Sequence, residues 1–255
     1  MGSNSKGNAT FLRIGDERYL IDAGISTKRI KKTLSEIGED ISNLDGVIIT
    51  HEHIDHISGI KSLSQIYQVK FWLSFETYKK IKKKVGNFDA EFIEVGEEFK
   101  LGKNLLIMPY EIPHDAIDPV AYLIKSVNGV PIIGYLMDCG DLNSYLIDGF
   151  RKVKILIIES NHSFDLLLQS DYPTFLKQRI LGTKGHLSNW DVGRFVIETN
   201  PGIAVLAHIS ENNNHPGTAL AEIEEVFARY MGKQSLPFIV VVNKKRRSTL
   251  IIAEV

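Results

Sequence analysis

The chain alternates short β-branched runs with segments in which apolar residues recur every three or four positions. Runs of four to eight apolar residues bounded by turn residues are typical of buried strands. Asn128-Gly129 is a hairpin turn signal between two of these runs, and the last two runs are expected to close the chain as a second hairpin. The predicted strands are Tyr19–Asp22, Gly46–Thr50, Lys70–Leu73, Phe92–Val95, Leu105–Pro109, Ala121–Ser126, Val130–Met137, Ile155–Glu159, Ile203–His208, Phe238–Val242 and Thr249–Ala253.

The helical spacing predicts four helices, Thr27–Ile37, His56–Tyr67, Ser188–Thr199 and Thr218–Tyr230. Gly38 is a stop signal after the first, while Ser188 is an expected N-cap with Asp191 in the first turn. Strands precede helices in each half, and no repeat or linker divides the chain. The pattern therefore predicts one α/β domain over residues 1–255, a four-layer αββα sandwich of two sheets with helices outside.

Composition narrows the class of protein. The 255 residues are 44% hydrophobic and 24% charged, as in globular proteins, and no run is long enough for a membrane span. Cys139 is the only cysteine, which excludes an intrachain disulfide and favours a cytoplasmic protein. The net charge of −1 argues against binding nucleic acid by charge alone. The basic runs Lys28–Lys32 and Lys79–Lys84 are either solvated helix faces or a local track for a polyanion, and Lys244–Arg247 is expected in a solvent-facing turn.

The segment His51-Glu52-His53-Ile54-Asp55-His56 carries the main chemical signal. Three imidazoles and a carboxylate within six residues are suitable ligands for zinc, manganese or iron. Strand alternation places His51 and His53 on one side, and the following turn brings Asp55 and His56 toward the same space. The spacing suits two adjacent metals, whereas a chance cluster on a solvated turn is the alternative.

Further ligand candidates lie at the ends of predicted strands. His114, Asp138 and His208 each follow such a strand, and with the cluster they complete two coordination shells in which Asp138 bridges the metals. His162 is expected to cover the metal rim or support a ligand, and His215 to lie in a loop without a catalytic role.

Two other features of the sequence can be explained without a functional role. Ser3 and Ser5 are either a phosphate-binding stretch or a flexible terminus. Cys139 is read as a packing residue, because alternation turns it away from Asp138.

These residues resemble the metallo-β-lactamase superfamily over nearly the whole chain. Thr-His-Glu-His-Ile-Asp-His at 50–56 and Ile-Asp-Ala-Gly at 21–24 resemble its motifs. More narrowly, the chain resembles the YycJ/WalJ group of bacterial and phage hydrolases, which are relatives of RNase Z. The segments behind this narrower resemblance are Gly-Ser-Asn-Ser-Lys-Gly-Asn at 2–8, Pro-His-Asp-Ala-Ile-Asp-Pro at 113–119, Glu-Ser-Asn-His at 159–162, Gly-His-Leu-Ser-Asn at 185–189 and Ala-His-Ile-Ser-Glu-Asn-Asn at 207–213.

The resemblance implies a ligand set and a mechanism. It assigns His51, His53 and His114 to one metal, Asp55, His56 and His208 to the other, and Asp138 to both. Two zinc ions are expected, with manganese as the alternative. Asp55 and Asp138 are expected to orient the attacking water and His186 to donate the proton, with His162, His186 and Ser188 on the substrate side.

The resemblance also implies the substrate class, a phosphodiester. A nucleic-acid exonuclease is marginally favoured, a 3′,5′-cyclic-nucleotide phosphodiesterase like the phage anti-Pycsar proteins is the alternative, and a catalytically silent metal-binding interaction module is the third reading. RNase Z relatives are often dimers, so a homodimer is expected.

The chain departs from this group at three places. Ser163 stands where the group usually has an aspartate, and Cys139 stands where it often has a threonine. The first strand that the group has before its Gly-Ser motif is expected to be either missing here or replaced by Met1.

Overall fold

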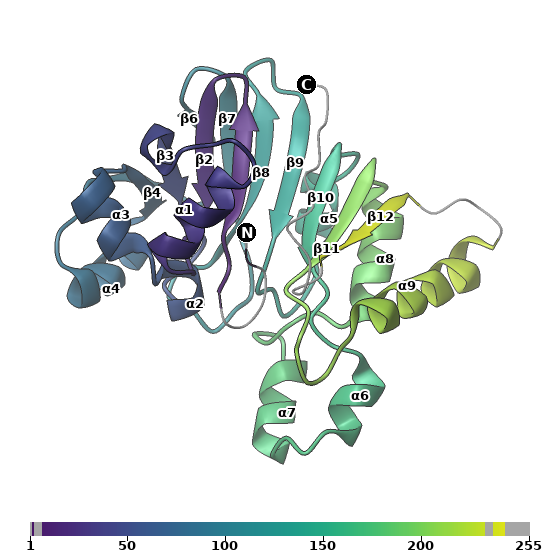
Figure 1. Cartoon of the computed structure of the whole chain (residues 1–255). Helices are drawn as coiled ribbons and strands as arrows, with labels where there is room; N and C mark the ends of the chain where they lie inside the picture. Colours follow the sequence, from purple (N-terminus) through teal and green to yellow (C-terminus); the bar gives the residue numbers. More distant parts are fainter. Residues whose placement is uncertain (1, 3–6, 233–236, 243–255) are drawn as a thin grey trace. The chain divides into compact units, whose positions relative to one another are not determined.

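A computed structural model of the protein describes residues 2, 7–232 and 237–242. The chain divides into two compact units, Met1–Glu111 with Ala116–Val120, and Ile112–Asp115 with Ala121–Val255. The fold is α/β, with two mixed sheets flanked by helices, which confirms the predicted class (Figure 1). The single domain over residues 1–255 stays a prediction beside this division. No helix in the described part of the chain has the length and apolar character needed to cross a membrane.

The first unit is built on a five-stranded sheet in the order β1-β2-β3-β4-β5. β1 and β2 pair antiparallel, and the other neighbours pair parallel. β6 and β7 of the same unit pair antiparallel. The strands are β1 (Thr10–Ile14), β2 (Glu17–Ile21), β3 (Gly46–Ile48), β4 (Phe71–Ser74), β5 (Ala90–Ile93), β6 (Phe99–Leu101) and β7 (Leu105–Glu111). Because β2, β3 and β4 run parallel, their carboxyl ends meet at one edge, and Asp22 and the histidine motif follow there.

The helices of the first unit share one apolar core with this sheet. Ile30 and Leu34, Leu63, Val47 and Phe71 are all buried in it, so α1 and α3 cover the same face of the sheet (Figure 1). The apolar spacing of each helix supplies the buried stripe, and its polar residues remain exposed. The helices are α1 (Thr27–Ser35), α2 (Ile54–Ile57), α3 (Ile60–Tyr67) and α4 (Phe75–Val85), with a 3₁₀ turn η1 (Ile41–Asn43).

In the second unit, the strands lie in the order β8-β9-β10-β11-β12. β8 and β9 pair antiparallel and the others parallel. Their ranges are β8 (Val120–Ser126), β9 (Pro131–Leu136), β10 (Ile155–Glu159), β11 (Ile203–Ala207) and β12 (Phe238–Val241). The parallel arrangement places Asp138, Glu159 and His208 together, since each lies at or just beyond the carboxyl end of its strand.

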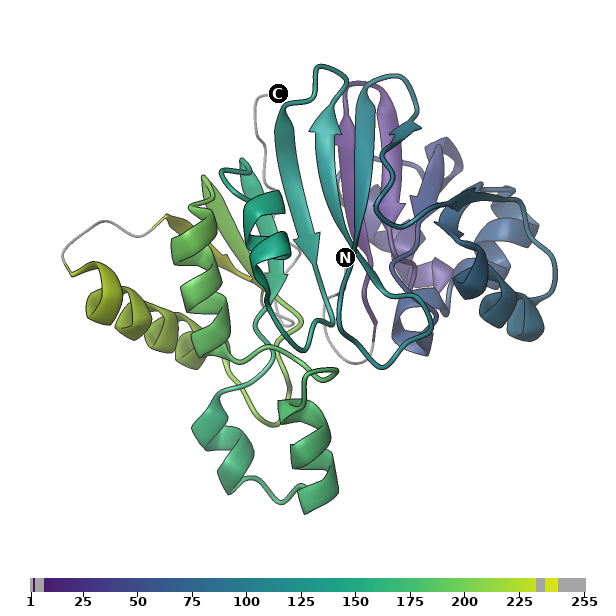
Figure 2. The ribbon, with the colours of Figure 1, turned by 180° about the vertical axis from the view of Figure 1, so that it is seen from behind.

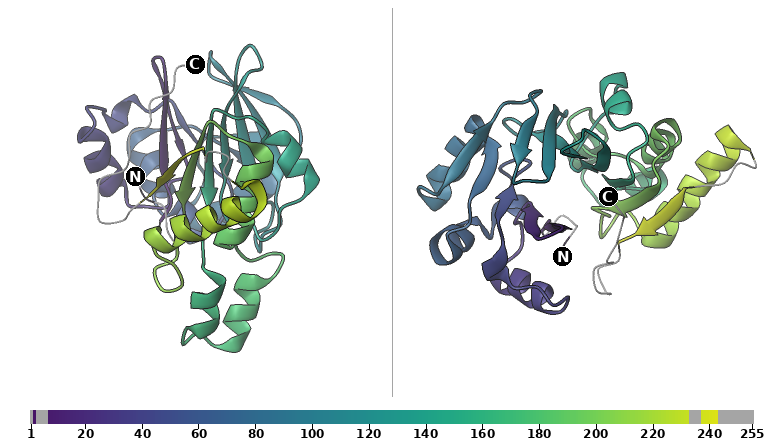
Figure 3. Two further views of the ribbon diagram at one scale, coloured as in Figure 1. Left: turned by 90° about the vertical axis from the view of Figure 1, so that its right-hand side faces the viewer. Right: turned by 90° about the horizontal axis from the view of Figure 1, so that it is seen from above.

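The helices of the second unit are of two kinds. α5, α8 and α9 lie on one face of its sheet (Figure 2), and α8 approaches α9 closely at Gly193, where a Cβ would lie 2.9 Å from Val226. By contrast, α6 and α7 form a pair that extends beyond the ends of the strands (Figure 3). The ranges are α5 (Ser144–Gly149), α6 (Phe164–Gln169), α7 (Thr174–Leu181), α8 (Asn189–Thr199) and α9 (Pro216–Met231).

One predicted helix is wrong as a continuous element. The segment His56–Tyr67 is split into α2 and α3, because Gly59 donates its N–H to the carbonyl of Ala23 at 2.7 Å and a Cβ there would lie 2.7 Å from the carbonyl oxygen of Ile25. The other predicted helices, and the predicted strands before residue 243, are present with shifted ends. β1, β6, α4, α5, α6 and α7 were not among the predicted elements. Ser3, Ser5, Lys244–Arg247 and Thr249–Ala253 lie outside the described residues.

Candidate metal and active site

The histidine motif of the first unit occupies the turn between β3 and α2. His51 is fully buried, His53 is the N-cap residue of α2, and Asp55 and His56 lie within that helix. The ring centroids of His51 and His53 are 4.6 Å apart, and those of His51 and His56 are 4.1 Å apart. Oδ2 of Asp55 lies 3.6 Å from Nε2 of His56. This is roughly the separation of two ligands about 2.0–2.2 Å from one tetrahedral ion, so the pair fits a metal.

Asp22 stabilises this turn through hydrogen bonds to Thr50 and His56. Its buried carboxylate accepts hydrogen bonds from the backbone N–H of Thr50 at 2.8 Å and from the Thr50 hydroxyl, and it pairs with Nδ1 of His56 at 2.8 Å. A carboxylate on Nδ1 places the proton there and leaves Nε2 of His56 as the electron-pair donor. The segment Ile-Asp-Ala-Gly at 21–24 thus contains a residue that orients the imidazole of His56.

The second unit contains a cluster of two carboxylate and two histidine side chains. One donor atom from each of Asp138, Glu159, His186 and His208 lies within 4.8 Å of the others. Nδ1 of His208 is 2.9 Å from Oδ1 of Asp138, and Nδ1 of His186 is 3.0 Å from Oε2 of Glu159. Two carboxylates and two imidazoles form a donor set that suits zinc or manganese, so the residues fit a metal here too.

Glu159 is the residue of this cluster that the sequence reasoning missed. It is fully buried, and its second oxygen accepts hydrogen bonds from the backbone N–H groups of Cys139 and Leu187. Burial alone would raise the pKa of Glu159, but the charge and hydrogen bond of His186, with the hydrogen bond of His208, hold it below its ordinary value. A signal existed, because Glu159 opens the Glu-Ser-Asn-His segment at the end of a predicted strand.

The pKa values of the two histidines of this cluster, His186 and His208, are raised. Burial would lower the pKa of His186, yet the charge of Glu159 and its hydrogen bond raise it above the ordinary value. The pKa of His208 is raised to about 10, because Asp138 and Glu159 outweigh the effect of burial. The carboxylates thus favour positive charge at this position, as a metal site requires.

His114 and His162 are buried histidines near the cluster. The rings of His114 and His186 have centroids 5.5 Å apart, Nδ1 of His114 lies 3.3 Å from the carbonyl oxygen of Gly185, and burial lowers the pKa of His114. Burial also lowers the pKa of His162 to about 4. Neither ring nitrogen of His162 has a hydrogen-bond partner among the described residues.

Ser188 and Cys139 have structural roles in the described part of the chain. Ser188 is the N-cap of α8, as predicted, and forms a capping box with Asp191, in which its hydroxyl lies 2.6 Å from Oδ2 of Asp191. Its place on the substrate side stays a prediction. Cys139 is fully buried, and burial raises the pKa of its thiol, as expected for a packing residue. His215 is the N-cap residue of α9, where its Nδ1 accepts the N–H of Gly217.

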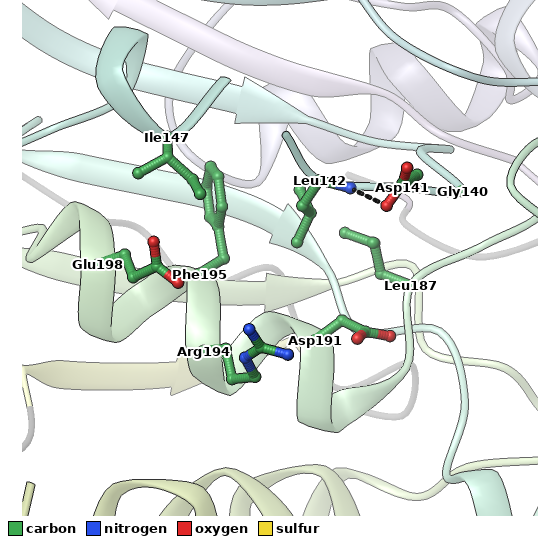
Figure 4. Close-up of a pocket in the computed structure, with 9 residues that line it drawn as sticks. All are labelled: Gly140, Asp141, Leu142, Ile147, Leu187, Asp191, Arg194, Phe195 and Glu198. Atoms are coloured by element: carbon green, nitrogen blue, oxygen red, sulfur yellow. Dashed lines mark hydrogen bonds between the residues drawn. The ribbon is translucent and has the colours of Figure 1, made fainter. Parts of the chain in front are cut away.

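A pocket of about 200 Å³ lies beside α8 in the second unit (Figure 4). Asp191, Arg194 and Glu198 of that helix line it, together with the loop Gly140–Leu142 after β9. None of the predicted metal ligands is among its lining residues. The pocket and the cluster of Asp138 are therefore lined by different residues.

Comparison with known proteins agrees with this geometry. The exodeoxyribonuclease WalJ of Streptococcus pneumoniae serotype 2 is 31% identical over 222 residues, which cover 84% of this chain and 81% of that protein. The exodeoxyribonuclease YycJ of Bacillus anthracis is 27% identical over 231 residues, 89% of this chain and 87% of that protein. The metallo-β-lactamase fold protein YhfI of Bacillus subtilis matches with a TM-score of 0.72 and 16% identity, covering 98% of this chain and 95% of that structure. Residues 3–142 match the family model of the metallo-β-lactamase superfamily, and the chain belongs to this superfamily.

Proposed function

We propose that the chain is a metal-dependent phosphodiesterase that degrades DNA as an exonuclease. The observation that carries this proposal is the similarity to WalJ over 84% of the chain, combined with the buried cluster of carboxylates and imidazoles at the strand ends. The metal site makes the chain a metallohydrolase of its superfamily, and the named relatives support DNA as the substrate.

The proposed ligand set is the one that the superfamily motifs imply. His51, His53 and His114 would hold one ion, Asp55, His56 and His208 would hold the other, and Asp138 would be shared by both. When bound, such ions lower the pKa of water to near neutrality and stabilise charge on phosphoryl oxygens. Zinc and manganese both suit these nitrogen and oxygen ligands.

His186 is the proposed proton donor to the leaving oxygen. With Nδ1 held by Oε2 of Glu159 at 3.0 Å, the imidazole has a fixed orientation and Nε2 carries the transferable proton. Glu159 also raises the pKa of His186, so a larger fraction is protonated near neutral pH. Asp55 and Asp138 orient the attacking water in this proposal. His162 and Ser188 are proposed to lie on the substrate side, and a homodimer is the proposed assembly.

A parallel assay tests the substrate. Protein loaded with Zn²⁺ or Mn²⁺ is offered single-stranded DNA, duplex DNA, RNA, 3′,5′-cyclic nucleotides and bis(p-nitrophenyl) phosphate. We expect progressive release of nucleotides from DNA ends, abolished in His51→Ala and retained in His215→Asn, which keeps a capping side chain at α9. If cyclic nucleotides are hydrolysed and DNA is not, the alternative function, a 3′,5′-cyclic-nucleotide phosphodiesterase, is supported instead. Bound metal without any hydrolysis would select the interaction module.

A further inference from the structure

We propose that Asn8 is a positioning residue for the Asp55–His56 metal ligands, an inference that rests on the metal binding of the proposed function. Asn8 ends the Gly-Ser-Asn-Ser-Lys-Gly-Asn segment and is 1% exposed. Its amide holds the carboxylate of Asp55 and the imidazole of His56 together, and on metal binding it keeps the carboxylate while releasing the imidazole.

The backbone of Asn8 is fixed directly to the metal motif. Its N–H donates to the carbonyl of Asp55 at 2.7 Å, and its carbonyl accepts the N–H of Gly24 at 2.7 Å. A Cβ at Gly24 would lie 1.5 Å from the carbonyl oxygen of Asp55 and 2.8 Å from the nitrogen of Asn8. Glycine at position 24 therefore permits the close contact, and three segments distant in sequence meet at Asn8.

The side chain of Asn8 reaches both ligands of the pair. Nδ2 lies 3.2 Å from Oδ2 of Asp55 and 2.9 Å from Nε2 of His56. Because Nδ1–H of His56 donates to Asp22, Nε2 of His56 is an acceptor. The two amide hydrogens of Asn8 therefore match two acceptors, Oδ2 of Asp55 and Nε2 of His56. The 3.6 Å separation of those acceptors, which suits a metal, is thus spanned by one group that donates to both.

The opposite end of the amide shows what this placement costs. Oδ1 of Asn8 is buried and has no hydrogen-bond partner among the described residues. A buried carbonyl without a hydrogen-bond partner destabilises the folded state, and an apolar side chain of similar size would avoid that penalty. An amide kept at this position despite the cost is explained by its two contacts with metal ligands.

Metal binding changes only part of this arrangement. An ion on Nε2 of His56 uses the electron pair that accepts from Asn8, so that hydrogen bond is lost. Oδ2 of Asp55 has further electron pairs and can accept from Nδ2 while it binds the ion. Asn8 then fixes the rotamer of Asp55, in the way that hydrogen-bonded neighbours orient metal ligands elsewhere.

The test measures metal binding without any nucleotide. Chelator-treated protein is titrated with Zn²⁺ and with Mn²⁺ by calorimetry, for the wild type, Asn8→Ala and a matched control, Asn104→Ala. Asn104 also donates from Nδ2 to a carboxylate, Glu17, at 2.8 Å, but outside the metal motif. We expect Asn8→Ala to weaken one of the two binding steps roughly 10–100-fold and to leave the other unchanged. Two unchanged steps in Asn8→Ala, or an equal loss in Asn104→Ala, would overturn the proposal.

Two further measurements separate positioning from direct ligation and from misfolding. The visible spectrum of the fully Co²⁺-loaded Asn8→Ala protein should keep the wild-type form, whereas a changed coordination number would show that Asn8 is itself a ligand and overturn the positioning role. Asn8→Asp places a carboxylate against Asp55, so its melting temperature in chelator should fall below that of Asn8→Ala. An equal melting temperature would contradict the contact. Wild-type protein that binds metal but leaves DNA intact would refute only the proposed substrate.

Discussion

At the residue scale, several site residues adopt a backbone conformation that most residues avoid. Asp22, Asp138 and His208 have φ of 60°, 53° and 48°, in the left-handed region. Such conformations cost on the order of 1–3 kcal/mol and cluster at functional sites, where surrounding contacts enforce them. At Asp22 the contacts are the hydrogen bonds from Thr50 and His56, and at His208 they are those to Asp138 and Glu159. The backbone strain thus falls on two proposed metal ligands, Asp138 and His208, and on Asp22, which orients His56.

The first prediction concerns the Glu159–His186 pair. His186→Ala should lower kcat roughly 10²–10⁴-fold, the usual range for acid–base groups, while metal content stays intact. Glu159→Gln removes the charge that raises the pKa of His186, so the loss of activity at high pH should begin at a lower pH than in the wild type. Metal analysis and pH–rate profiles check both variants. If His186→Ala loses metal, the residue is a ligand, and His186 no longer serves as the proton donor.

The second prediction concerns His162 and acid stability. The pKa of His162 falls to about 4 in the folded protein, against about 6.5 in an unfolded chain. Between these values the unfolded state binds more protons, so this residue removes stability as the pH falls from about 6.5 to about 4 and has no effect above that window. The loss amounts to roughly 3 kcal/mol once the pH is below both values.

His162→Gln should flatten that part of the profile. Denaturant unfolding in chelator at several pH values measures it, with His215→Asn as the control. A variant with the same slope as the wild type between pH 4 and 6.5 would show that His162 is protonated without penalty.

The proposed metal ligands are easier to recognise in the sequence than the residues that support them. His51, His53, Asp55 and His56 are recognisable because they are close in sequence and follow a strand. Asn8, Asp22 and Glu159 are not, since a single amide or carboxylate is common and its role appears only when distant segments meet. The contact between Asn8 and Asp55 joins residues 47 positions apart.

At the element scale, the parallel strands do most of the positioning. The carboxyl ends of β9, β10 and β11 bring Asp138, Glu159 and His208 to one edge of the sheet of the second unit. The apolar runs that form these strands are readable in the sequence, and so is the edge. Helices α6 and α7 are not readable in the same way, because helices of six and eight residues contain too few turns to show a period. In α4, five lysines dominate the composition, although Thr77 and Ile81 supply its buried face.

The third prediction concerns the start of α8. The Ser188 hydroxyl accepts the N–H of Asp191, and the Asp191 carboxylate accepts the N–H of Ser188. Ser188→Ala should therefore lower the free energy of unfolding by about 1 kcal/mol. Ser188→Thr keeps the hydroxyl and serves as the matched control in urea unfolding.

Kinetics of the same variants separate the two roles of Ser188. An unchanged KM for DNA in Ser188→Ala assigns the residue to the helix alone. A raised KM in Ser188→Ala but not in Ser188→Thr supports the proposed substrate contact.

At the scale of the whole molecule, bound metal is expected to contribute to stability as well as catalysis. The buried cluster concentrates Asp138 and Glu159 close together, and the raised pKa values of His186 and His208 show that protons relieve this negative charge. A divalent ion supplies the same compensation and displaces the proton of His208, which is a proposed ligand, while His186 keeps its proton. Ligand binding to the folded state alone stabilises it by RT ln(1 + [L]/Kd), about 2.7 kcal/mol at 100 times Kd.

The fourth prediction follows from this linkage. Adding Zn²⁺ or Mn²⁺ to chelator-treated protein should raise the melting temperature by roughly 5–10 °C for each ion bound at 100 times its Kd, given the usual 2–4 °C per kcal/mol for chains of this size. Asp138→Ala should abolish activity and most of this rise, because Asp138 is proposed to bind both ions. Asp138→Gly should do the same but melt at a higher temperature in chelator than Asp138→Ala, since glycine adopts the φ of 53° at no steric cost. Scanning calorimetry with parallel metal analysis measures the melting temperature in chelator and its rise on adding metal, and a DNA hydrolysis assay measures the activity. A full metal-dependent rise in Asp138→Ala would show that neither ion depends on Asp138, and the bridging role would be lost.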